Sequence, residues 1–425
     1  MDQPLSIGVV GAGTAGAAAA TLLARAGHTV TVLERVADPK PIGAGITLQP
    51  TGQVALARIG ALDAVHARGA RIDRLLCVRR GNRPLVALPY ADIDPRLYGL
   101  GIHRGVLFET LFAAAGEAGA TIECGVGVVR SELSASGRAL VDDRGRTHGP
   151  FDLVIAADGS VSELHKDAPR VTSTAYPWGA LWLVVEDTKF NAERTLHQTV
   201  DGAGRMLGLL PTGKPPGKET SCVSMFWSLR ADRVDAWRGA GLSAWREEVL
   251  RVDERAEPIL DTLGDLESVL FTRYRDVAMW PWHADRIVFI GDAAHATSPQ
   301  LGQGANLALL DAVALADAIA AEPTVARALA AYSASRRRHL DFYQFATRAL
   351  TPLFQGDSRI LGWLRDRTFP TSHWLGFLRR RMVRAMCGID RGVLRGPMAI
   401  ADVLSPHALL AAPDPTVGDG RTILR

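Results

Sequence analysis

A cluster of glycines and one carboxylate could do chemistry in the second half of the chain. The segment 286–306 reads RIVFIGDAAHATSPQLGQGAN and leads into an alanine- and leucine-rich stretch. The apolar run before Gly291 predicts a strand, and the stretch 305–321 predicts a helix. Backbone amides at a helix N-terminus attract negative charge, and a carboxylate such as Asp292 accepts hydrogen bonds from hydroxyl groups. The pattern therefore predicts a place for an anionic group and a polyol, although a plain turn and loop have the same composition.

A second glycine-rich turn lies near the start of the chain. Ser6–Val10 predicts a strand, Gly11–Gly16 a tight turn, Ala17–Ala26 a helix and Thr29–Leu33 a second strand that ends at Glu34. Glycines let a pyrophosphate approach the helix N-terminus, and an acid at this distance binds a ribose hydroxyl pair. We interpret the turn as a dinucleotide site rather than a plain turn. An acid at this position favours FAD or NAD over NADP.

Several fixed positions then resemble a known family. Gly291–His295, Pro299, Gly302–Asn306 and Asp311 look like the second FAD-binding motif of the FAD-dependent aromatic hydroxylases. These are single-component flavoprotein monooxygenases with the para-hydroxybenzoate hydroxylase fold. The resemblance implies that FAD is the cofactor and that NAD(P)H is a transient co-substrate. No metal is expected, because Cys77, Cys124, Cys222 and Cys387 lie far apart with no CxxC spacing.

Three further segments match the same family. Gly43–Ile46 resembles the segment that lies along the flavin, and Arg104 resembles an arginine that reaches the FAD; an ordinary loop and a surface arginine are the alternatives. Asp158-Gly159 resembles the motif that serves FAD and the nicotinamide cofactor. The chain departs from that motif at Val161 and at His165-Lys166, which puts the nicotinamide half in doubt.

The expected cofactor-binding residues come from all of these motifs. They are Gly11, Gly13, Ala15, Gly16, Glu34, Arg35, Gly45, Arg104, Asp158, Asp292, Gly302, Gly304, Ala305 and Asn306.

The resemblance implies an α/β fold with a discontinuous Rossmann-type FAD-binding domain, an inserted antiparallel β-sheet substrate domain and C-terminal helices. We expect the first part of the FAD domain at 1–169, the sheet domain at 170–275, the second part of the FAD domain at 276–350 and a helical cap and tail at 351–425. Short alternating strands separated by turns support the sheet domain. They are expected at Tyr176–Val185, Thr195–Val200, Arg205–Leu210 and Ser221–Leu229.

The substrate is expected between that sheet and the flavin. The candidate lining residues are Trp182, His197, Leu207, Leu209, Pro211, Phe226 and Trp227, although an aromatic residue on a strand is more often core. The candidate catalytic residues are His197, Pro299 and Trp182. His197 could orient or deprotonate a phenol if it faces the cavity, because its unperturbed pKa is near neutrality; a solvent-facing histidine is the alternative.

The resemblance implies the reaction class. NAD(P)H reduces FAD, O2 adds to form a C4a-hydroperoxide, and one oxygen passes to a small aromatic or otherwise electron-rich substrate, by hydroxylation or epoxidation. A reductase or dehydrogenase of the same fold would share the FAD motifs. A flavin halogenase would need a catalytic lysine, but no lysine lies between Lys40 and Lys166. A non-catalytic flavin-binding protein is the remaining alternative.

Composition and charge indicate which kinds of partner and which cellular compartment to expect. The 425 residues carry a net charge of only +3 and no long basic run tied to aromatics, so nucleic acid is not expected. The four cysteines lie far apart and the N-terminus has no leader pattern, so we expect a cytoplasmic protein. We expect it to be a monomer or a homodimer. A last helix is expected near Ser372, with Trp374, Leu375, Leu378, Met382 and Ala385 on one face. Such a face usually packs on its own protein, but a basic amphipathic helix can also lie on a membrane surface.

Overall fold

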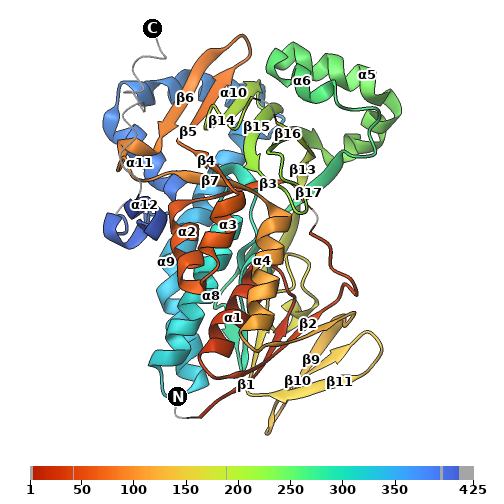
Figure 1. Ribbon diagram of the computed structural model, residues 1–425, viewed down its shortest axis with the longest axis vertical. Coiled ribbons are helices and arrows are strands. Elements are labelled where there is room, and N and C mark those ends of the chain that lie inside the picture. The colour runs from red at the N-terminus through yellow and green to blue at the C-terminus, as the bar shows by residue number, and fades with distance from the viewer. Residues whose placement is uncertain (1–2, 42, 188, 393–395, 411–425) are drawn as a thin grey trace.

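The computed structural model describes residues 3–41, 43–187, 189–392 and 396–410. Of the predicted segments, Ile42 of the glycine loop and the tail 411–425 lie outside the described residues. Figure 1 shows a lower part built around parallel strands and long helices, and an upper part in which a second sheet meets the C-terminal helices.

A six-stranded sheet forms the centre of the lower part, in the order β18-β19-β12-β1-β2-β8. β1 pairs in parallel with β2 on one side and β12 on the other, and only β18 at the edge is antiparallel. The strands are short and almost wholly apolar because helices cover both faces of a parallel sheet. The bounds are β1 Ser6–Val10, β2 Thr29–Glu34, β8 Thr121–Cys124, β12 Leu153–Ala156, β18 His283–Ala284 and β19 Ile287–Phe289.

The five helices α1, α2, α4, α8 and α9 pack on this sheet or on one another. Ala17–Ala20 of α1 are fully buried or nearly so, and such small side chains let α1 pack closely between α4 and α8. α8 is long and apolar enough to cross a membrane by length and composition, but it packs against α1, α2 and α9 as a core helix does. The bounds are α1 Thr14–Arg25, α2 Pro50–Ile59, α4 Arg104–Glu117, α8 Gly304–Ala321 and α9 Val325–Phe354.

Two three-stranded antiparallel sheets flank the central one. The first, β11-β10-β9, forms the hairpin pair at the lower right of Figure 1. The second, β3-β7-β4, lies below the upper sheet, and α3 packs against its middle strand. The bounds are β3 Gly45–Leu48, α3 Leu62–Arg68, β4 Ala70–Ile72, β7 Gly99–His103, β9 Val128–Ser134, β10 Gly137–Asp142 and β11 Thr147–Phe151.

A seven-stranded sheet forms the upper part, in the order β17-β13-β16-β15-β14-β5-β6. The four predicted strands are confirmed as β13, β14, β15 and β16. Two further strands, β5 and β6, come from residues 74–89, within the segment assigned to the FAD domain, and β17 crosses residue 275. The domain boundaries themselves stay a prediction. The bounds are β5 Arg74–Arg79, β6 Arg83–Pro89, β13 Val171–Glu186, β14 Thr195–Asp201, β15 Arg205–Gly213, β16 Cys222–Arg230 and β17 Leu270–Met279.

Helices cover the two faces of the seven-stranded sheet. α5 (Val234–Val252) and α6 (Glu257–Leu260) pack on one face through a core that contains Trp227 and Trp245. The other face contributes Ala180 and Phe226 to a core shared with the C-terminal segments. Those segments are α10 Arg359–Thr368, α11 Gly376–Cys387 and α12 Pro406–Leu410. The last long helix therefore begins at Gly376 rather than near Ser372, because a 3-10 helix occupies Phe369–His373.

Short 3-10 helices complete the described elements. They are η1 Tyr90–Asp92, η2 Glu163–Asp167, η3 Ala231–Arg233, η4 Glu254–Ala256, η5 Pro299–Leu301, η6 Phe369–His373 and η7 Ile400–Val403.

Candidate active site

The turn between β1 and α1 is built so that only glycine fits at two positions. Gly11 has a φ of +95°, and a Cβ there would lie 2.7 Å from the carbonyl oxygen of Ala157. A Cβ on Gly16 would lie 2.0 Å from the carbonyl oxygen of Gly11. A Cβ on Gly13, in contrast, would meet no atom within 4 Å. The turn is therefore closed toward the protein and open in front of the α1 N-terminus, where a pyrophosphate would lie in a dinucleotide site.

Glu34 lies beside this turn at the end of β2. Its Oε2 accepts a hydrogen bond from the Ala12 amide at 2.8 Å, and its Oε1 accepts one from the Val36 amide at 2.9 Å. These two bonds hold the carboxylate next to the glycine turn, as a ribose-binding acid requires. Arg35 is exposed beside Gly127 and the structure gives it no polar partner among the described residues.

The Gly43–Gly45 loop lies between Arg104 and the seven-stranded sheet. A Cβ on Gly43 would lie 3.1 Å from the Cβ of Arg104, whose amide donates to the carbonyl of Ala44 at 3.0 Å. On the other side, the Gly45 amide donates to Ser224 Oγ at 2.8 Å. A Cβ on Gly45 would lie 2.5 Å from Thr212 Oγ1. The loop thus joins the two parts of the molecule, and Arg104 is exposed next to it.

Asp158 follows β12, directly beside the first glycine turn. Burial raises the pKa of its carboxyl group above the ordinary value, although a hydrogen bond from Ser162 acts in the opposite direction. Its Oδ1 is buried and has no hydrogen-bond partner among the described residues. A buried acceptor without a partner costs about 1–3 kcal/mol, so a donor from a bound ligand would relieve this cost.

Gly291 brings the two FAD motifs together. It has a φ of +60°, and a Cβ there would lie 2.8 Å from the Cβ of Ala15 and 3.4 Å from the Cβ of Ala308. Only glycine therefore fits at this position between α1 and α8, directly before α7 (Asp292–His295). Asp292 itself is exposed, and its Oδ1 lies 4.0 Å from the point where a Cβ would stand on Gly304.

The loop before α8 is held by side chains that point away from its amides. The fully buried Asn306 accepts from the Gln49 amide at 2.8 Å and donates to the Thr47 carbonyl at 3.2 Å. Its side chain therefore positions the loop, and only backbone groups of Gly304, Ala305 and Asn306 are left for a ligand. Gly302 adopts a left-handed φ of +61°, and Pro299 is exposed at the start of η5.

A buried ionic network lies under Gly291. Asp311 accepts from the Gly291 amide at 2.9 Å and from Arg336 Nε at 2.7 Å, and it also pairs with His295. Burial would raise the pKa of Asp311, but the charges of His295 and Arg336 outweigh it and lower the pKa to about 2. Arg336 in turn contacts His339 at 3.0 Å. The network fixes the strand end that carries Asp292.

The sequence reasoning missed Arg336 and His339 as parts of this network. Arg336 lies in a run of three arginines that resembles a solvated helix face. In the sequence, Tyr332, Arg336, His339 and Tyr343 lie three or four residues apart, which places them on one face of a helix. The structure shows that this face of α9 is buried.

Trp182 and Phe226 lie on the face of the upper sheet that also meets the glycine loop. Their rings are 5.0 Å apart, and a Cβ on Gly208 would clash with the Phe226 ring at 1.9 Å. Tyr274 on β17 packs in the same core, and burial raises its pKa well above the ordinary value. Gln355 donates to the Gly179 carbonyl of β13 at 3.2 Å and accepts from Gln300 Nε2 at 2.9 Å. We call Trp182, Phe226 and Tyr274 the aromatic group. The Gln300–Gln355 bond connects the same sheet to the loop that begins at Pro299.

His197 lies on the opposite face of the same sheet, which corrects its predicted role. Its Nε2 is 3.3 Å from Asp253 Oδ2, and its Nδ1 is 3.2 Å from an Arg255 nitrogen. Burial alone would raise the pKa of Asp253, but hydrogen bonds from His197 and Thr199 lower it below the ordinary value. His197 therefore lies on the side of the sheet away from the Gly43–Gly45 loop, not on the side where the substrate is expected. Leu207, Leu209 and Trp227 belong to the same core under α5.

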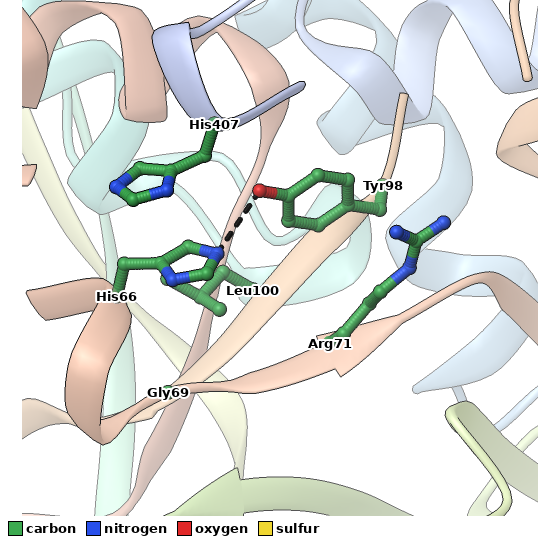
Figure 2. A pocket seen from close by; sticks show the side chains of 6 residues that line it. All are labelled: His66, Gly69, Arg71, Tyr98, Leu100 and His407. Atoms are coloured by element: carbon green, nitrogen blue, oxygen red, sulfur yellow. Dashed lines mark hydrogen bonds between the residues drawn. The ribbon is translucent and has the colours of Figure 1, made fainter. Parts of the chain in front are cut away.

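The structure shows two concavities away from these motifs. Figure 2 shows the first, of about 220 Å³, where the rings of His66 and His407 stack 4.0 Å apart and His66 Nε2 lies 3.1 Å from the Tyr98 hydroxyl. Arg71 lies over the Tyr98 ring at 4.7 Å. This concavity lies where α12 docks on α3. The second, of about 490 Å³, lies beside α11.

These residues fit an FAD molecule. Glycine positions that no Cβ could occupy surround the turn before α1, Asp158 has a buried acceptor without a partner, and Glu34 and Asp292 place carboxylates beside two helix N-termini. Among the described residues, no group of three or more histidine, cysteine or acidic side chains could hold a metal ion.

Comparison with known proteins agrees with this fit. Residues 5–342 match the family described as FAD binding domain. The chain is 31% identical over 332 residues to 3-amino-4-hydroxybenzoate 2-monooxygenase of Streptomyces cremeus, covering 76% of this chain and 80% of that protein. It is 30% identical over 353 residues to kynurenine 3-monooxygenase of Stenotrophomonas maltophilia, covering 78% and 75%.

Solved structures show the same fold. Klebsiella pneumoniae HpxO complexed with FAD superposes with a TM-score of 0.75 at 21% identity, covering 90% of this chain and 99% of that one. Pseudomonas aeruginosa PqsL in complex with 2-aminobenzoylacetate gives a TM-score of 0.74 at 23% identity, covering 85% and 99%. The matches in sequence and fold, together with the cofactor site, show that the chain belongs to the FAD-dependent aromatic hydroxylases and is an FAD-dependent monooxygenase.

Proposed function

We propose that the protein uses NAD(P)H and O2 to hydroxylate, or epoxidise, a small aromatic substrate that binds between the seven-stranded sheet and the FAD. The observation that supports this most directly is the position of the Gly43–Gly45 loop. It lies against Arg104 of the cofactor site on one side and against Ser224 and Thr212 of the upper sheet on the other. A ring bound on that face would lie next to the flavin. In this proposal, the FAD-binding domain consists of residues 1–169 and 276–350, and the substrate domain consists of residues 170–275. Residues 351–425 form a helical cap and tail.

The protein residues bind, orient and exclude water. Glu34 would hold the adenosine ribose and Asp292 the ribityl chain, as their places beside α1 and α8 indicate. The amides that begin α8 would stabilise negative charge on the reduced cofactor. When bound, FAD supplies the redox chemistry that activates O2. No residue of the chain need act as a nucleophile.

We further propose that the substrate ring is uncharged. The aromatic group contains Trp182, Phe226 and Tyr274, and the Gln355 amide is bonded to the Gly179 carbonyl of the same sheet and to Gln300. Arg365, a buried cation that lies over the Phe354 ring of this core, is already paired with Asp366 at 2.7 Å. A carboxylate on the ring would be buried without a cationic partner, which is costly. The relatives named for aminohydroxybenzoate and kynurenine act on acids, so this chain would differ from them in substrate class.

NAD(P)H would bind transiently. A resident nicotinamide domain needs a second strand, GxGxxG turn and helix. The two other glycine pairs do not supply one: Gly125 and Gly127 lie between β8 and β9, and Gly239 and Gly241 lie within α5.

A substrate screen with the purified yellow protein tests the proposal. Neutral phenols and quinolones, each matched with its ring carboxylate, are tested for faster NAD(P)H consumption, and products are analysed after reaction under ¹⁸O2. We expect a neutral compound to accelerate consumption and to gain one labelled oxygen. Faster consumption without label in any product would support the reductase or dehydrogenase alternative instead. Faster consumption and labelling with the ring carboxylates than with the neutral compounds would contradict the proposed substrate class. It would not contradict the proposed monooxygenase reaction.

A further inference from the structure

Large apolar side chains are exposed on the C-terminal helices. Of the eleven exposed large hydrophobic residues among those described, six fall between residues 360 and 377. Trp374 is 89% exposed and Phe377 is 74% exposed. We call these six the C-terminal patch: Ile360, Trp363, Leu364, Trp374, Leu375 and Phe377. Scattered surface residues need no explanation, but such a concentration marks an interaction surface.

The helices of the patch dock on the protein through other residues. On α10, Gly362 and Arg365 are buried, whereas Ile360, Trp363, Leu364 and Arg367 form an exposed stripe at i, i+3, i+4 and i+7. On α11, the buried residues Val383, Met386 and Cys387 all lie in its C-terminal half. Trp374 and Leu375 were expected to share a face with Met382 that packs on the protein, but they precede the helix and are exposed.

The charge around the patch is strongly positive. Between residues 357 and 384 the chain contains seven arginines, no lysine, no glutamate and two aspartates. Some arginines are paired, such as Arg379 with Asp92 at 2.6 Å. Arg380 and Arg384 have no salt bridge within the described part of the chain. They line the 490 Å³ concavity beside α11 with Ile93, Pro397, Met398, Ala399, Ile400 and Asp92, whose carboxylate is paired with Arg379.

This combination fits a lipid surface better than a second copy of the chain. Exposed tryptophan and phenylalanine beside arginines are the residues that enter the headgroup region of a bilayer, and each basic residue near an anionic bilayer adds attraction. A symmetric contact between two copies would bring the same surface of each subunit together, and with it arginines of one sign. Arg367 already lies over the Trp363 ring at 5.4 Å, which leaves that aromatic face less available to a protein partner.

We propose that the C-terminal patch is a peripheral docking surface for bilayers that contain anionic phospholipids, and that the Arg380–Arg384 concavity receives a lipid phosphate. α10 and α11 lie at the upper end of the molecule in Figure 1, away from the N-terminus and the six-stranded sheet. Docking would therefore leave the FAD-binding helices free. The contact rests on side chains at the surface and involves no membrane-spanning segment.

Sedimentation of the FAD-loaded protein with vesicles tests the proposal. We expect binding to vesicles of phosphatidylcholine mixed with phosphatidylglycerol and little binding to phosphatidylcholine alone. Binding should weaken in high salt, because screening shortens electrostatic attraction. The double variant Trp374→Ala/Phe377→Ala and the double variant Arg380→Glu/Arg384→Glu should each lower the partition coefficient at least about tenfold.

Matched controls separate the patch from general surface effects. Phe345→Ala removes an aromatic side chain that is 71% exposed on α9, outside the patch, and Arg144→Glu/Arg233→Glu makes the same charge change at exposed positions elsewhere. Both should bind vesicles like the wild type, and all variants should keep their flavin absorbance. Absence of binding to anionic vesicles would overturn the proposal, as would equal loss in patch and control variants. A wild-type dimer that the Trp374→Ala/Phe377→Ala variant converts to a monomer, without any vesicle binding, would assign the patch to a second copy.

Discussion

Glu34 and Asp292 are the carboxylates that the structure leaves beside the two glycine loops. Each would form charge-assisted hydrogen bonds with FAD hydroxyl groups, so we predict that Glu34→Ala and Asp292→Ala each lose about 1.5–3 kcal/mol of binding, or about ten- to a hundredfold in affinity. The measurement is flavin content and fluorescence release on serial dilution. Glu132→Ala, an exposed acid on β9 that is paired with Arg130 at 2.9 Å, is the control and should keep its flavin.

Full flavin retention by both variants would contradict this placement. Loss of flavin from Glu34→Ala alone could come from a distorted glycine turn, because Glu34 also accepts hydrogen bonds from the Ala12 and Val36 amides. Asp292, which is exposed, has no such structural role among the described contacts. Its variant is therefore the cleaner test of a direct contact with the cofactor.

His339 predicts a pH dependence of stability. Burial and the Arg336 charge lower its pKa from 6.5 to about 3, and its Nε2 lies 2.7 Å from the Gly388 carbonyl. Below pH 6.5 His339 becomes protonated in the unfolded chain but stays neutral in the folded protein. The stability that this neutral histidine contributes is therefore complete above pH 6.5 and falls as the pH decreases toward 3, by about 1.4 kcal/mol per pH unit.

The His339→Gln variant isolates that contribution, because glutamine keeps a donor for Gly388 but does not titrate. Urea unfolding of both proteins at several pH values between 7 and 4 gives the difference. As the pH decreases, the free energy of unfolding of the wild type should fall more steeply than that of the variant. The difference in slope should correspond to the uptake of about one proton on unfolding. Parallel pH profiles would show that His339 is protonated in the folded protein or that the network opens before it titrates.

At the scale of elements, the N-terminus of α8 is the expected anion site. Proline is tolerated at the first position of a helix, where its missing N–H removes one donor. We predict that Gly304→Pro slows flavin reduction more than it lowers Tm. Gly304→Ala is the matched control: it keeps the N–H, and its Cβ would lie 4.0 Å from Asp292 Oδ1, an ordinary contact.

Anaerobic stopped-flow measurement of both variants decides between the alternatives. A Gly304→Pro protein that binds FAD and is reduced at the wild-type rate would show that this amide does not stabilise the reduced cofactor. Equal slowing by Gly304→Ala would instead assign the effect to the loop conformation. Gln303 supports that conformation by donating to the Met386 carbonyl at 2.7 Å.

At the scale of the whole molecule, the substrate should control the reduction of the flavin. Reduced flavin without substrate would be oxidised wastefully, so we predict that the true substrate accelerates reduction by favouring a reducible arrangement. A hundredfold acceleration requires only about 2.7 kcal/mol of preference if that arrangement is initially rare. The Gly43–Gly45 loop contacts both the upper sheet and Arg104, so a ligand on the upper sheet could shift that equilibrium.

Stopped-flow reduction without oxygen, with and without substrate, checks this prediction. The control is an unreactive compound of similar size and polarity. Equal reduction rates with a substrate that is demonstrably hydroxylated would refute the gating and leave the monooxygenase assignment unaffected.

The sequence by itself determined the cofactor and the local elements that hold it. The glycines at Gly11, Gly16 and Gly291 can be recognised from the sequence because each is required by a backbone contact or a left-handed conformation within a short motif. The four expected strands of the upper sheet followed from local alternation, which has a period of two residues. Family resemblance added the reaction class.

Only the tertiary structure decided which faces these elements present. Alternation places His197 on one side of a strand, but it does not say which side meets the Gly43–Gly45 loop; the core under α5 and the contact with Asp253 place His197 on the other side. The addition of β5 and β6 to the upper sheet and the burial of Arg336 depend on contacts between residues far apart in the chain. The exposure of Trp374 likewise depends on what the rest of the fold leaves uncovered, because helical periodicity defines an apolar face without naming its partner.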